Sequence, residues 1–165
     1  MGNRGTKRYD WAYKQSNQNM IERVHHNGTE LALIIRKSFK KDGVEFFTPN
    51  DYSQQIGYMQ RPTGHIIPPH VHNPVAREVH FTREVLIIRS GKLRVDLYTD
   101  EADYVESAIL EAGDIILLAA GGHGFEVLEE TEMIEVKQGP YAGEQDKTRF
   151  PGIDASEVVI RSDSK

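Results

Sequence analysis

The sequence predicts an all-β protein, a sandwich or barrel of short strands, on three observations. From Leu31 onward, apolar runs of four to eight residues recur, each bounded by Gly, Pro, Asn or Asp. The segment from Lys92 to Tyr98 alternates between apolar and polar residues, as an antiparallel strand with one wet face does. No stretch carries a convincing apolar stripe with the helical period of 3.6 residues.

Turn-forming residues and changes in composition mark where each element is expected to begin and end. Asn27-Gly28 predicts a tight turn before the first strand. Residues 1–28 are polar and rich in Asn and Gln, so we expect an N-terminal arm, followed by a barrel over 29–150 and a C-terminal tail or edge strand over 151–165. The expected strands, in order, are 31–39, 45–47, 54–59, 64–67, 80–88, 92–98, 107–110, 115–118, 124–128 and 133–137.

Composition excludes several classes of protein. A length of 165 residues predicts one domain, and the formal net charge of −5 argues against a protein that binds nucleic acid through its phosphates. The longest apolar run, Ile115 to Ala120, has six residues, whereas a membrane helix needs about 20. The chain has no cysteine, which excludes disulfides and thiolate metal sites. We expect a cytoplasmic protein that binds a small molecule and neither nucleic acid nor membrane.

Histidines concentrate in one part of the chain. Four of the seven, His65, His70, His72 and His80, fall within sixteen residues. His70 and His72 are two residues apart, and on an extended backbone this spacing directs both imidazoles to one face, where they can share a metal. Alone, a His-x-His pair is a weak signal.

Glu84 and His123 strengthen the metal hypothesis. Glu84 lies at the head of the apolar run Val85 to Ile88, where an ionised carboxylate facing an apolar interior needs a compensating cation or hydrogen bonds. His123 follows the most apolar strand and is flanked by Gly122 and Gly124, which leave room for a group to approach.

Together these residues resemble the two sequence motifs of the cupins, a superfamily of small jelly-roll β-barrels. The first motif, G-x5-H-x-H-x3–4-E-x6-G, is matched in front by Gly64, His70 and His72 and at the back by Glu84 and Gly91. The second, G-x5-P-x-G-x2-H-x3-N, is similar to the stretch from Gly113 to His123. The resemblance covers roughly 63–136.

The sequence also departs from these motifs. Eleven residues separate His72 from Glu84 where the motif has three or four, so Glu78 and His80 remain rivals of Glu84 as the ligand. Only Glu84 keeps the six-residue spacing to Gly91. In the second motif Ala119 replaces the proline, His123 arrives one position early and Val127 replaces the asparagine.

The resemblance implies one divalent transition metal, Fe, Mn, Ni, Co or Zn, held by His70, His72, Glu84 and His123. It further implies a small single-domain cupin that acts on a small polar molecule such as a sugar or a carboxylic acid, as a metal-dependent oxygenase or isomerase. Two alternatives stay open: a metal-free sugar epimerase or isomerase with His70 or His72 as general base, and a non-catalytic binder of small ligands. Because many cupins pair through an edge strand or an exchanged arm, we expect a homodimer.

Overall fold

The computed structural model describes residues 20–162, with the side chains of 144 and 145 excepted, and all structural statements refer to these residues. The chain divides into two compact units, each described by itself. The main unit comprises the described residues up to Phe39 and from Arg83 onward, and the inserted unit comprises Lys40–Thr82.

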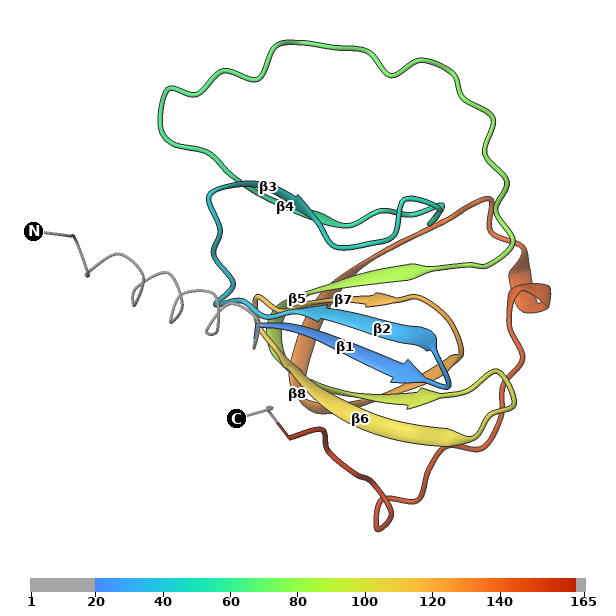
Figure 1. The fold of residues 1–165 in the computed structure, drawn as a ribbon. Helices are drawn as coiled ribbons and strands as arrows, with labels where there is room; N and C mark the ends of the chain where they lie inside the picture. Colours follow the sequence, from blue (N-terminus) through green and yellow to red (C-terminus); the bar gives the residue numbers. More distant parts are fainter. Residues whose placement is uncertain (1–19, 163–165) are drawn as a thin grey trace, which may run out of the picture. The chain divides into compact units, whose positions relative to one another are not determined.

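The main unit is a curled antiparallel sheet (Figure 1). Its strands run in the order β1-β2-β7-β5-β6, and β8 pairs with β5. The first part of β5 lies between β7 and β8, and the second part lies between β6 and β8. The strands are β1 (Ile21–His26), β2 (Thr29–Ile35), β5 (Glu84–Tyr98), β6 (Tyr104–Glu111), β7 (Ile115–Leu118) and β8 (Gly122–Lys137). The prediction of an all-β, barrel-like fold is confirmed.

The period-2 pattern of the sequence builds the core of the main unit. Alternate residues of β5 face one side of the sheet, where they pack with residues of the neighbouring strands. Each fully buried leucine or isoleucine there contributes about 2 kcal/mol to folding. The cluster consists of Val24, Leu31, Ala32, Ile34, Leu86, Ile88, Leu93, Val95, Leu97, Ala108, Leu110, Ile116 and Leu118.

Glycines shape one turn that the sequence predicts and one set of bulges that it does not. Asn27 and Gly28 both have positive φ, 48° and 85°, and form the tight turn of the β1–β2 hairpin. Gly91, with φ of 79°, lies among the register shifts of the β5–β8 pair, where an added Cβ would stand 2.0 Å from the carbonyl oxygen of Glu130. These bulges let β5 and β8 run on as single long strands where the sequence predicts two strands each.

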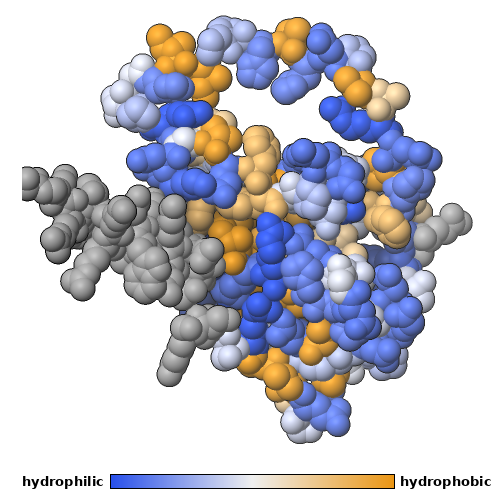
Figure 2. Space-filling view, in the orientation of Figure 1, coloured by the Kyte–Doolittle hydropathy of each residue, from blue (hydrophilic) through white to orange (hydrophobic). Residues whose placement is uncertain are grey.

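The inserted unit contains one hairpin, β3 (Gly43–Phe46) with β4 (Gly57–Gln60). Residues 61–82 of this unit form no strand, so the strand expected over 64–67 is wrong, and the strand expected over 80–88 begins only at Glu84. Apolar and polar side chains intermingle along this extended segment (Figure 2). Its exposed large apolar residues are Ile66, Ile67, Val71, Val75, Val79 and Phe81.

The ends of the chain differ from a simple arm and tail. β1 lies within the range expected as the arm, and residues 1–19 of that range lie outside the described part. After a 3-10 turn at Gly143–Asp146, the tail returns to β6, where Ile160 makes a parallel bridge to Ser107. Within residues 20–162 there is no helix with the length and apolar character to cross a membrane.

Candidate functional site

Glu84 and His123, distant in sequence, meet in the main unit. Glu84 opens β5 and His123 is the second residue of β8. The Oε2 atom of Glu84 lies 3.1 Å from Nε2 of His123, and the two side chains are 16% and 28% exposed. In the sheet Glu84 stands opposite Leu118, a member of the core cluster, so its side chain projects from the core-lining face. These two predicted ligands therefore meet on the face of the sheet that lines the core.

Glycines before His123 fix how β8 begins. At Gly121, which has a φ of 70°, an added Cβ would lie 2.2 Å from the carbonyl oxygen of Tyr98. At Gly122 it would lie 2.7 Å from the ring of Phe150. The room that these glycines leave is thus taken by the chain's own Tyr98 and Phe150, which hold the start of β8 against the end of β5.

Lys137 joins the cluster from the other end of β8. It is paired in register with Glu84, and its Nζ atom lies 3.6 Å from Oε1 of Glu84 and 3.1 Å from Oε1 of Glu135. The hydrogen bond from His123 lowers the pKa of Glu84; burial opposes this, and the positive charge of Lys137 adds to it. The hydrogen bond to Glu135 raises the pKa of Lys137. The cluster at neutral pH therefore holds an ionised carboxylate beside an ammonium group.

His70 and His72 lie in the inserted unit and form a second pair. Their ring centroids are 5.2 Å apart in an edge-on arrangement, and Nδ1 of His70 lies 3.1 Å from the carbonyl oxygen of Pro68. The rival ligands Glu78 and His80 pair with each other at 3.5 Å, with both side chains exposed.

The four predicted metal ligands thus form two pairs, one in each unit. Among the described residues there is no group of three or more His, Asp or Glu side chains that converge on one metal position. Glu84–His123 and His70–His72 are each close pairs, and the four-ligand centre stays a prediction.

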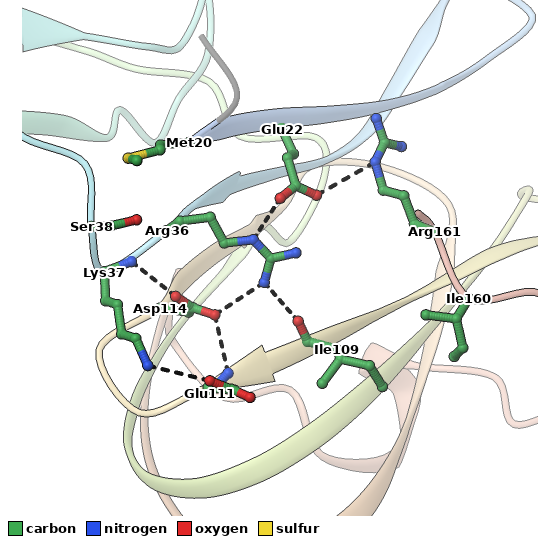
Figure 3. Close-up of a pocket in the computed structure, with 10 residues that line it drawn as sticks. All are labelled: Met20, Glu22, Arg36, Lys37, Ser38, Ile109, Glu111, Asp114, Ile160 and Arg161. Carbon is green, nitrogen blue, oxygen red and sulfur yellow. Dashed lines mark hydrogen bonds and ion pairs between the residues drawn. The ribbon is translucent and has the colours of Figure 1, made fainter. Parts of the chain in front are cut away.

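A different polar cluster, which no sequence pattern indicated, lines a cavity of about 520 Å³ in the main unit (Figure 3). The guanidinium of Arg36 donates hydrogen bonds to Glu22 at 2.5 Å, to Asp114 at 3.0 Å and to the carbonyl oxygen of Ile109 at 2.6 Å. The lining residues are Met20, Glu22, Arg36, Lys37, Ser38, Ile109, Glu111, Asp114, Ile160 and Arg161.

Charges around this cavity compensate one another. Asp114, almost fully buried, also accepts the backbone N–H groups of Lys37 and Glu111 at 2.9 and 3.0 Å. Arg161 of the tail lies 3.5 Å from the second carboxylate oxygen of Glu22. Carboxylates and cations thus pair around the cavity, and we interpret the Arg36 cluster as a structural tie between strands and tail. No local sequence signal marks it, because its members come from four separate segments.

Comparison with known proteins adds no relative: no family model, curated protein or solved structure matches this chain.

Proposed function

We propose that this protein is a metal-binding cupin that acts on a small polar molecule, such as a sugar or a carboxylic acid. The observation that carries the proposal is the approach of Glu84 to His123 within 3.1 Å on the core-lining face of the sheet. A half-buried carboxylate next to an imidazole offers one oxygen and one nitrogen ligand, and this combination suits divalent Fe, Mn, Ni, Co or Zn. As part of this proposal we place the protein in the cytoplasm, consistent with its cysteine-free composition.

Two of the proposed ligands, Glu84 and His123, are placed to fit such a metal. Oε2 of Glu84 and Nε2 of His123 are close enough for both to reach one cation at about 2 Å from each atom. The motif resemblance adds His70 and His72 to the proposed ligands, and within the inserted unit their rings are neighbours, with centroids 5.2 Å apart. When bound, the metal would supply a Lewis acid with exchangeable positions for substrate or water. His123 and Glu84 would orient it, and the surrounding apolar core would limit access of bulk water.

The position of Lys137 beside Glu84 favours a second candidate function, metal-free acid–base catalysis by an epimerase or isomerase. Its ammonium already supplies a positive charge to Glu84. When Nε2–H of His123 donates to Glu84, the Nδ1 atom keeps a lone pair that can accept a proton from a substrate. In this candidate Glu84 orients the imidazole and Lys137 stabilises the carboxylate.

Metal content separates the two candidates. Protein purified without a chelator or a polyhistidine tag is expected to carry close to one equivalent of a transition metal, measured by elemental analysis. The double variant His70→Ala, His72→Ala is expected to lose it. If wild type and variant carry the same trace of metal, the metal proposal fails and the metal-free candidate stands.

A matched pair of variants tests which carboxylate binds. Glu84→Gln is expected to lower metal retention by at least tenfold, because it removes the charged oxygen beside His123. Glu78→Gln, at a position with a largely exposed side chain, is expected to retain the metal. The reverse result would move the ligand to the inserted unit.

We further propose that the protein is a homodimer. Among the described strands β8 pairs only with β5, and it exposes large apolar side chains at 38–58%. An apolar edge strand of this kind tends to be covered by a partner. Light scattering is expected to give twice the chain mass of 18.7 kDa. A single-chain mass at every concentration tested would contradict the dimer. The exposed apolar residues of β8 are Phe125, Val127, Leu128, Met133, Ile134 and Val136.

A further inference from the structure

Lys137 occupies an unusual place for a lysine. It ends β8 directly opposite Glu84, so both side chains project from the same face of the sheet. Its side chain is only 25% exposed, and its ammonium lies between two carboxylates, at 3.1 Å from Glu135 and 3.6 Å from Glu84. Glu135 stands opposite Leu86 of the core cluster, so it belongs to that face as well.

Both oxygens of Glu84 are engaged by this arrangement. His123 contacts Oε2 and Lys137 approaches Oε1. A divalent cation that binds Glu84 would bring two further positive charges close to the ammonium, and the repulsion between them would oppose binding. The ammonium already lies closer to Glu135 than to Glu84, and the flexible lysine stem allows it to give up Glu84 and keep Glu135.

We propose that Lys137 is a resident cation that competes with the metal for Glu84. In the metal-free protein its ammonium partly neutralises Glu84, and on metal binding it leaves Glu84 and stays paired with Glu135 alone. Lys137 thereby sets the affinity of the site, so that only a cation that binds tightly displaces it. This inference rests on the proposed metal-binding function.

Titration of metal-stripped protein with Zn²⁺, followed by calorimetry, tests the competition. Lys137→Gln and Lys137→Met remove the ammonium and are expected to tighten zinc binding about tenfold, which corresponds to about 1.4 kcal/mol. Lys137→Arg keeps the positive charge and is expected to bind zinc no more tightly than the wild type. Lys92→Gln is the matched control, because Lys92 pairs with Glu111 and Glu129 at 3.3 and 3.5 Å. It is expected to leave zinc affinity unchanged.

Glu135→Gln provides a test of opposite sign. Without the second acceptor, the ammonium remains at Glu84, and zinc binding is expected to weaken severalfold. In the wild type, the NMR signal of the labelled Lys137 ε-carbon is expected to shift on zinc addition while that of Lys92 stays in place. This signal reports the movement even where a variant fails to fold.

The outcomes are distinguishable. A wild type that binds no zinc overturns the proposed metal function itself. A wild type that binds zinc while Lys137→Gln and Lys137→Met bind it equally or more weakly overturns the competition alone. An unmoved Lys137 signal on zinc saturation overturns it as well.

Discussion

Two ionic clusters on the same sheet use similar residues in different ways. In the Arg36 cluster, Asp114 accepts three hydrogen bonds, two of them from the backbone, and Arg36 donates to two carboxylates and a carbonyl. In the Glu84 cluster two side chains hold the carboxylate, at 3.1 and 3.6 Å, and within residues 20–162 no backbone group is seen to join them. Both oxygens of Asp114 are thus held by hydrogen bonds that include backbone donors, although Oε2 of Glu22 in the same cluster is buried without a hydrogen bond from the described residues. The contacts of Glu84 come from two side chains, which can exchange partners.

The difference follows from what each cluster connects. The Arg36 cluster joins β1, the end of β2, β6 and the turn before β7, so its loss would loosen four segments. The Glu84 cluster connects β5 with the two ends of β8. A site that takes up a ligand must have groups whose partners can be replaced, because a fully satisfied buried network is costly to open. Of the two, the Glu84 cluster is the one suited to binding.

Removing Arg36, the central cation of the Arg36 cluster, is expected to have the largest effect on stability. Arg36→Met leaves Glu22 and the buried Asp114 without their main cation. We expect the free energy of unfolding to fall by about 3 kcal/mol, because breaking a buried pair strands a charge. Urea denaturation at neutral pH measures it, and zinc affinity is expected to stay unchanged.

Lys37→Met is the control for this variant. Lys37 borders the same cavity, but its ion pair with Glu111 is about half exposed on both sides. The expected loss is at most about 0.5 kcal/mol, as for exposed pairs in general. Equal losses for the two variants would show that the Arg36 cluster is an ordinary surface network, no more buried in effect than the Lys37–Glu111 pair.

The sequence was sufficient for the parts of the fold that local patterns encode. The alternation in Lys92–Tyr98, the apolar run of β7 and the Asn27-Gly28 turn each carry their structure within a few residues. The union of strands into β5 and β8 was not predictable in this way, because it depends on the bulges where Gly91 approaches the other strand. The strand expected over 64–67 failed because its residues pair with no strand in the described part of the chain, residues 20–162.

For the candidate site, motif spacing found Glu84 and His123 but not Lys137. Nothing in the local sequence links Lys137 to Glu84, since the two meet only through the register of β5 with β8. The Arg36–Asp114 contact escaped prediction for the same reason. Cross-strand neighbours become visible only when the register is known, whereas residue types suited to metal binding are visible in the sequence.

Changing Glu84 in the Glu84 cluster is expected to have a smaller and pH-dependent effect on stability. The pKa of Glu84 is held below its usual value, so its ionised form stabilises the fold above about pH 4.3, and this contribution is lost as the pH falls through the lowered pKa. Because the group is partly exposed and screened by solvent, Glu84→Gln is expected to cost about 1 kcal/mol or less at pH 7. Urea denaturation of metal-free protein at pH 7 and pH 3 measures the change, with Glu78→Gln as a neutral control. The difference from the wild type is expected to be smaller at pH 3 than at pH 7. A loss of the same size at pH 7 and pH 3 would mean that the substitution acts through packing. The Glu84 cluster would then resemble the Arg36 cluster in having a structural role.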